Sequence, residues 1–150
     1  MGAIGICFTD NFALTMMLES AVLAPVMCQP SLPLDQAGGI AMSTEDLIAV
    51  KQRLHRDKLT VLAYRFDGDR FCKAERFAAY SAALGERSVA RVLPDSAAKR
   101  EGLAPFFQQV VASPHSVVTA HLIDEAGQPT VAARDEILPF FAMRLGAQPS

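Results

Sequence analysis

The chain alternates between short apolar runs and longer stretches whose apolar residues have helical spacing. The apolar runs have the length of β-strands, and they lie at residues 2–6, 21–28, 59–64 and 88–93. Helical spacing follows the first three runs at residues 12–18, about 44–57 and 73–84. After the fourth run comes a loop at 94–114 with room for a short helix, and helical spacing then extends over 115–145, interrupted at Gly127-Gln128-Pro129. Strands that alternate with helices form right-handed β-α-β units. The sequence therefore predicts an α/β fold, with a parallel sheet of about four strands and flanking helices.

The crossover rule also predicts how the helices are distributed over the sheet. Right-handed crossovers that all run in one direction place the three linking helices on the same face. Only the final helix is then left for the other face, which is expected to be half covered. The run at 88–93 alternates more than the others, which is typical of a strand near an edge.

Length and composition set further limits. With 150 residues the chain is expected to form a single domain, residues 1–150. Hydrophobic residues make up 51% of it, so some apolar surface is expected to contact a partner. Glu19, Pro25 and Pro30 interrupt the longest apolar stretches before the roughly 18 residues that a membrane span needs. The N-terminus lacks the basic segment of a signal peptide, and no membrane association is expected.

Charge and cysteine content narrow the function classes. A formal net charge of −2 gives no reason to expect a nucleic-acid partner. Residues 1–50 hold no Lys or Arg, a pattern that indicates a buried central segment. Three cysteines, without a C-x-x-C pair, favour reduced thiols and a cytoplasmic location over disulfides. The three histidines lack metal-binding spacing, so neither a metal nor a cofactor is expected.

The strongest candidate for chemistry is the segment Gly5-Ile6-Cys7-Phe8-Thr9, which joins the first apolar run to the first helical pattern. A nucleophilic side chain between small residues at a strand-to-helix turn is the arrangement of a nucleophile elbow. The helix that follows directs backbone N–H groups at the thiol and favours the thiolate. Cys7 is therefore a candidate nucleophile, and the alternative is a small buried cysteine that ends a strand.

Two further candidates follow later strands. Asp69 comes after the third apolar run and His115 after the fourth, and ligands of parallel sheets bind beyond the carboxyl ends of the strands. The chain order of nucleophile, acid and histidine is that of α/β-hydrolases. Asp67 competes with Asp69 for the role of the acid.

At these residues the chain resembles the dienelactone hydrolase family, whose members have a cysteine nucleophile on an α/β-hydrolase fold. The matching segments are Gly5-Ile6-Cys7, Gly68-Asp69-Arg70-Phe71 after a strand, and His115-Ser116-Val117-Val118 opening the last helix. The resemblance covers nearly the whole chain but only the second half of the family's domain. It implies a partial, N-terminally truncated α/β-hydrolase fold.

The resemblance also implies roles for the residues. Cys7 would attack an ester or lactone, His115 would act as general base and then acid, and Asp69 would orient His115. Phe8 N–H would be one oxyanion-hole donor, while the family's second donor comes from a segment that precedes residue 1. Activity is therefore expected to be weak or absent.

Two departures from the family pattern affect the site. Thr9-Asp10-Asn11 stands where the family has glycine after the elbow, and Asp10 is expected to oppose thiolate formation. Thr119 stands where dienelactone hydrolase has an arginine that clamps the substrate carboxylate. A dienelactone is therefore not the expected substrate.

The remaining histidines and thiols are expected to be structural. His55 is expected on the surface of a charged helix end, and His121, on the final helix, is expected to face away from His115. Cys28 and Cys72 are expected in the core or in loops.

The alternative function is a non-catalytic, truncated hydrolase-like module that self-assembles or binds a partner. Residues 2–6 are interior in the full family fold and become an edge strand here, without Lys, Pro or any charge to prevent pairing. A homo-oligomer is therefore expected, most simply a two-fold dimer through the edge of strand 2–6.

Overall fold

The computed structural model describes residues 1–146, and four strands in this part of the chain form one parallel sheet. The strands lie in chain order across the sheet: β1 (Gly2–Ile6), β2 (Ala24–Cys28), β3 (Val61–Phe66) and β4 (Ser88–Leu93). Each pairs in parallel with the next. The predicted α/β fold with about four parallel strands is confirmed.

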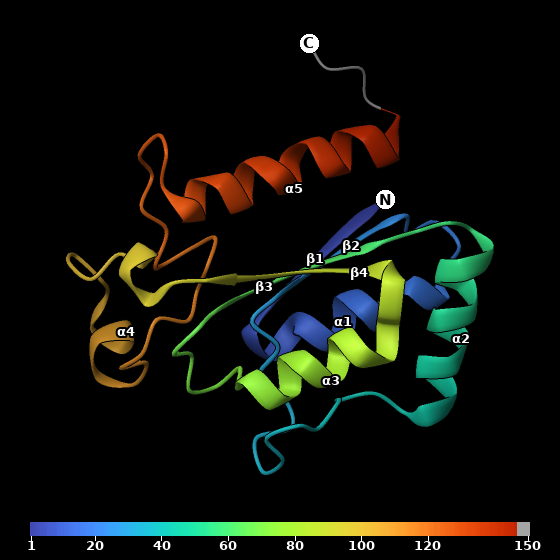
Figure 1. Ribbon diagram of the computed structural model, residues 1–150, viewed down its shortest axis with the longest axis horizontal. Coiled ribbons are helices and arrows are strands. Elements are labelled where there is room, and N and C mark those ends of the chain that lie inside the picture. The colour runs from blue at the N-terminus through green and yellow to red at the C-terminus, as the bar shows by residue number, and fades with distance from the viewer. Residues whose placement is uncertain (147–150) are drawn as a thin grey trace.

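Helices cover the two faces of the sheet unequally, as the crossover rule predicts. The helices are α1 (Asp10–Thr15, between 3₁₀ turns Cys7–Thr9 and Met16–Leu18), α2 (Thr44–Arg56), α3 (Ala74–Leu84), α4 (Pro105–Gln109) and α5 (Pro129–Leu145). Figure 1 shows α1, α2 and α3 below the sheet and α5 above it. Two hydrophobic clusters result, one between the sheet and α1–α3 and the other between the sheet and α5. Every residue of β2 is buried, which explains its unbroken apolar sequence.

Two predicted strands begin too early in the chain. The strand predicted at 21–28 begins at Ala24, because a turn precedes it in which Val22 N–H donates to the carbonyl of Glu19 at 3.1 Å. The strand predicted at 59–64 is instead Val61–Phe66, because Leu59 N–H donates to Leu54 C=O at 2.9 Å and belongs to the end of α2. In both cases the apolar residues before the strand belong to a turn or to the C-terminal end of a helix.

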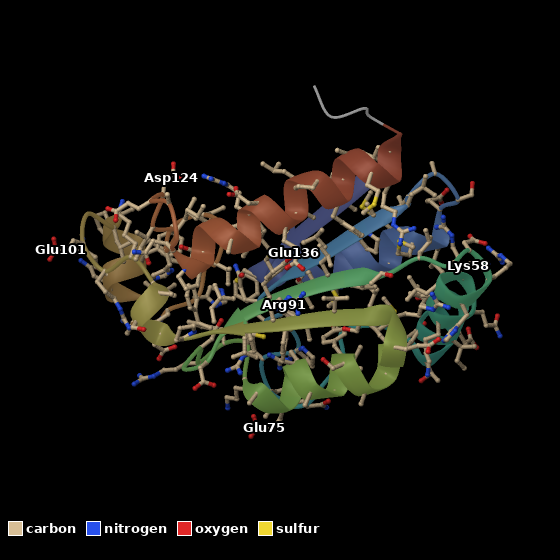
Figure 2. The ribbon with its side chains drawn as sticks, turned by 45° about the horizontal axis from the view of Figure 1, so that its top comes forward. Lys58, Glu75, Arg91, Glu101, Asp124 and Glu136 are labelled. Carbon is tan, nitrogen blue, oxygen red and sulfur yellow. The ribbon has the colours of Figure 1, made fainter. Side chains whose placement is uncertain are left out.

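Helix α5 is held on its face of the sheet by a polar contact as well as by hydrophobic packing. Glu136 of α5 accepts a hydrogen bond from the Tyr64 hydroxyl at 2.7 Å and pairs with Arg91 of β4 at 2.9 Å. Figure 2 shows Arg91 and Glu136 facing each other between β4 and α5. Among residues 1–146, no helix is both long and apolar enough to cross a membrane.

The prediction of a helix over residues 115–126 is wrong, whereas the helix predicted to resume after the interruption at Gly127-Gln128-Pro129 and to end near Leu145 is confirmed as α5. Residues 115–128 form turns and irregular loop, and α5 begins at Pro129. The imidazole Nδ1 of His121 accepts hydrogen bonds from the backbone N–H groups of His115 and Ser116, at 3.4 and 3.0 Å. These bonds satisfy donors that a helix would otherwise leave free at its first turn. Apolar residues at helical spacing here belong to a folded loop.

The turn from β1 into α1 depends on a close approach of two backbone segments. A Cβ atom on Gly5 would lie 2.5 Å from Asp10 Cα and 2.6 Å from the carbonyl oxygen of Thr9. Both neighbours are backbone atoms, so no side-chain movement relieves the clash. Only glycine therefore allows the helix to begin directly above the end of β1.

We expect Gly5→Ala to destabilise the protein by about 2 kcal/mol or more, because the new methyl group displaces the backbone of the turn. Urea unfolding followed by circular dichroism measures this loss. Gly38→Ala is the matched control, since its nearest neighbour would lie at 3.8 Å, an ordinary contact. Equal effects of the two substitutions would contradict the close approach.

Candidate active site

Cys7 occupies a strained turn at the carboxyl end of β1. Its φ of 60° lies in the left-handed region, which non-glycine residues adopt rarely. The hydroxyl of Thr9 fixes the turn by accepting from Ile6 N–H at 3.0 Å and donating to Ile6 C=O at 2.9 Å. The thiol is half-buried. Thr9, which departs from the glycine of the resembling family, thus supports the turn in this chain.

His115 and Asp69 are joined by a short, buried hydrogen bond. Nδ1 of His115 lies 2.8 Å from Oδ2 of Asp69. The other oxygen, Oδ1, accepts from the N–H groups of Phe71 and Cys72 at 2.9 and 3.0 Å, which holds the carboxylate in place. The competing acid, Asp67, has an exposed side chain beside Arg65. The structure therefore puts Asp69, not Asp67, against the imidazole.

The other imidazole nitrogen of His115 faces the thiol side of the site. Nε2 is buried, and no acceptor among the described residues meets strict hydrogen-bond geometry with it. Cys7 and His115 nevertheless line the same pocket and alter each other's ionisation. A loose contact of this kind is expected of a nucleophile and base without substrate. Cys7, His115 and Asp69 are thus brought together from three distant parts of the chain.

The pKa values of Cys7 and His115 shift in opposite directions. Burial raises the pKa of the Cys7 thiol, but interactions with His115, the Ser31 hydroxyl and the Phe8 N–H lower it below its ordinary value overall. Burial lowers the pKa of His115, whereas the hydrogen bond to Asp69 and the interaction with Cys7 raise it to about 9. Both shifts favour a thiolate–imidazolium pair over the neutral pair.

Asp10 is buried near the thiol, and its charge and that of Cys7 oppose each other. Its side chain is 1% exposed, and neither carboxyl oxygen makes a side-chain hydrogen bond to a described residue. Burial raises the pKa of Asp10 well above its ordinary value, the backbone of Cys28 lowers it less strongly, and the charge of Cys7 raises it further. A raised pKa favours the neutral carboxyl group, which opposes ionisation of Cys7 less than a carboxylate would.

Two residues after β2 belong to the site although the sequence did not single them out. The Ser31 hydroxyl donates to Gln29 C=O at 2.9 Å and also interacts with the Cys7 thiol. Gln29 is fully buried, and its side-chain nitrogen, in the orientation that satisfies its neighbours, donates to the carbonyls of Cys28 and His115 at 3.1 and 3.2 Å. Their position after a parallel strand was the available signal.

The sequence-based prediction for His121 is wrong. Its ring does not face away from His115, because the loop folds back and His121 Nδ1 accepts the hydrogen bonds from backbone N–H groups described above. Burial lowers the pKa of His121, as does the charge of His115. A neutral His121 can accept these bonds, so it positions the backbone of His115.

The remaining candidates have structural positions, as predicted. Cys28 and Cys72 are fully buried, and His55 is exposed with Glu86 at 3.8 Å. No group of three or more His, Cys, Asp or Glu side chains within residues 1–146 is arranged to hold a metal ion.

A pocket of about 510 Å³ opens beside Cys7 and His115. The short helix α4 forms one wall with Phe106 and Phe107, and Phe71 forms another, with its ring 5.3 Å from the ring of His115. The thiol and the imidazole therefore border a space large enough for a small-molecule substrate.

Comparison of the chain with protein-family models, with curated proteins and with solved structures finds no match. The interpretation of the site therefore depends on its geometry and on the sequence motifs. That geometry places a thiol with a lowered pKa, an imidazole bound to a carboxylate, and a pocket next to one another.

We expect Cys7 to react with iodoacetamide at a lower pH than an ordinary thiol, whose pKa is about 8.5. A thiol with a lowered pKa is ionised, and so reactive, at pH values where a free cysteine is protonated. Removing the imidazole by His115→Ala should move the midpoint of the rate–pH profile upward. Mass spectrometry of the alkylated protein measures the rate at each pH.

Internal controls come from the chain itself. Burial raises the pKa values of Cys28 and Cys72, so only one thiol should react in the folded protein. His55→Ala removes an exposed imidazole and should leave the profile unchanged. A midpoint that is the same with and without His115 would contradict the thiolate–imidazolium pair.

Proposed function

We propose that this protein is a hydrolase of the dienelactone hydrolase type, which cleaves an ester or lactone through Cys7, His115 and Asp69. The single observation that carries the proposal is the hydrogen bond between His115 Nδ1 and Asp69 Oδ2 at 2.8 Å. It leaves Nε2 of the imidazole free on the side of the pocket where Cys7 lies. A carboxylate that orients a histidine next to a thiol is the shared logic of such triads.

The reaction proceeds in two acyl-transfer steps. The Cys7 thiolate attacks the acyl carbon, and the bond to the alcohol oxygen breaks while His115 gives its proton to the leaving alkoxide. The acyl group is then held on Cys7 as a thioester. His115 next takes a proton from water, which attacks the thioester, and the acid leaves as the thiolate forms again. No oxidant, reductant or cofactor is needed for this sequence.

Each assigned group has support in the structure. Cys7 has a left-handed backbone conformation, and the backbone N–H of Phe8 interacts with the Cys7 sulfur. Phe8 N–H is therefore the proposed oxyanion donor. Gln29 and His121 hold the carbonyl and the N–H of His115, which limits movement of the base. Phe8 N–H is the one oxyanion donor assigned here. Because the loss of a second donor lowers the rate by about 10²–10³, slow turnover is expected.

We expect p-nitrophenyl acetate to acylate Cys7 in a single-turnover burst. His115→Ala should slow the burst by about 10² or more, because the general base is lost, and Asp69→Asn by about tenfold or more, because the imidazole loses its orienting partner. Stopped-flow absorbance of p-nitrophenolate gives the rate, and intact-mass spectrometry identifies the acetylated residue.

The control for this experiment is again His55→Ala, which should retain the burst. Cys7→Ser tests the nucleophile, and its acetylation by the weaker hydroxyl should be slower by about 10³ or more. Acetylation at any other residue, or a burst that survives His115→Ala, would show that the proposed triad does not catalyse the reaction.

A second candidate function, self-assembly through the β1 edge, is favoured by one observation. β1 pairs only with β2 among residues 1–146, and large apolar side chains are exposed on β1 and on the turns and helix that follow it. They are Ile4, Phe8, Phe12 and Met16, which are 43%, 48%, 57% and 41% exposed. A free strand edge with apolar flanks favours pairing with a second copy in a two-fold dimer.

Three free thiols in the described chain are consistent with the proposed cytoplasmic location.

We expect the protein to be a dimer at micromolar concentration, and Ile4→Lys to weaken the dimer by about tenfold or more, because a charge at a pairing edge is desolvated on association. Multi-angle light scattering over a dilution series measures the effect. Val92→Lys is the matched control, since Val92 is 52% exposed on β4, at the opposite edge of the sheet. A monomer whose residues 2–6 exchange amide hydrogens rapidly would rule out this assembly.

A further inference from the structure

The pocket beside Cys7 has walls made almost entirely of hydrocarbon. Its volume of about 510 Å³ is bounded by apolar side chains that include Ile6, Phe8, Phe71, Phe106, Phe107 and Val110. None of the residues that line it in the described part of the chain is Lys, Arg, Asp or Glu. A ligand inside this pocket therefore meets charge only at Cys7 and His115.

The polar groups of the pocket lie at the reacting centre. His115 Nε2 is buried without a partner among the described residues, while Nδ1 is already bound to Asp69. The Cys7 thiol and the residues Ser116 and Thr119 supply the other polar groups of the lining. A ligand that satisfies this arrangement has one polar group, next to Cys7 and His115, and an apolar remainder.

The rim of the pocket gives a second reason to expect an apolar ligand. Phe8, Phe106 and Val110 are all exposed, and Phe106 and Val110 come from the same wall, at and just beyond α4. An apolar ligand gains free energy by removing this surface from water. A carboxylate among these apolar side chains, away from Cys7 and His115, loses its hydration and finds no cation, which is costly.

We infer that the pocket binds the uncharged aromatic or branched apolar acyl group of an ester or lactone, and excludes acyl groups that carry a carboxylate. The identification of the ligand as an acyl group rests on the proposed function. The preference for a neutral ligand over an anionic one does not require turnover, so it is tested separately.

The test uses the full chain with Cys7→Ala, which binds ligands without consuming them. Methyl benzoate and monomethyl terephthalate form a matched pair, which differs by one carboxylate on the ring. We expect methyl benzoate to bind with a Kd at least about tenfold lower, and to shift the amide NMR signals of Phe107, Val110 and Thr119. Equal affinities, or tighter binding of the anion, would overturn the inference.

A charge placed on the rim should change this preference. Val110→Lys puts an ammonium group in the lining and is expected to bring the affinity for monomethyl terephthalate to or above that for methyl benzoate. Gln109→Lys is the matched control, because Gln109 is exposed at the end of the same helix and does not line the pocket. The same change in relative affinity in both variants would show that the ligand does not occupy the pocket. No change in relative affinity in either variant would also contradict the inference.

Kinetics with the unmodified protein separate the two proposals. 4-Nitrophenyl benzoate should acylate Cys7 at least about tenfold faster, in kcat/KM, than the corresponding ester of terephthalate. Selective binding without acylation of Cys7 would contradict the hydrolase and leave the ligand preference standing. Acylation of Cys7 at equal rates by both esters would support the hydrolase and overturn the preference.

Discussion

The buried hydrogen bond between His115 and Asp69 is the contact on which the site depends. It joins the loop after β3 to the long segment between β4 and α5. In the described chain this segment is irregular apart from a 3₁₀ turn and the short helix α4. Because Nδ1 is committed to the carboxylate, Nε2 is directed to the pocket and the tautomer of the neutral ring is fixed. The charge of Asp69 also offsets the desolvation of His115 and so raises the pKa of the imidazole. The imidazole in turn lowers the pKa of the Cys7 thiol beside it.

Buried arginines from later in the chain hold the N-terminal third, which has no basic residue of its own. Arg53 of α2 donates to the carbonyls of Ser20 and Val22 at 2.8 and 2.7 Å, just before β2. Arg76 of α3 donates to Gly39 C=O at 3.1 Å and Phe71 C=O at 2.8 Å, which links the loop after β2 to the edge of the site. Loop carbonyls that would be unsatisfied in the interior thereby receive charged donors.

Phe8 connects the two proposed functions. Its backbone N–H interacts with the Cys7 sulfur, and its side chain both lines the pocket and is exposed beside the free edge of β1. A second copy paired along β1 would therefore cover apolar surface next to the mouth of the pocket. The proposed assembly and the proposed catalysis would then be linked through one residue, because the same side chain would be buried by either a partner or a substrate.

The sequence alone determined the sheet and the residues that approach its carboxyl edge. Apolar runs long enough for strands, separated by helical spacing, are sufficient for four parallel strands, because the hydrophobic pattern and the crossover rule are local properties. Cys7 and Asp69 follow directly from this, since each lies just beyond a strand. Gly5 also marks its turn, because the backbone approach there leaves no room for a side chain.

Only the tertiary structure decided how the segment around His115 is folded and how the site is ionised. The helical spacing of residues 115–128 is real, but the backbone donors of His115 and Ser116 are satisfied by the ring of His121, so a loop replaces the predicted helix. Asp10 was expected to repel the thiolate, and its burial, which raises its pKa, favours the neutral form and weakens that repulsion. Ser31 and Gln29 gave no motif to recognise. These outcomes depend on which groups lie next to one another after folding, because burial and hydrogen bonding between distant segments are not encoded in local spacing.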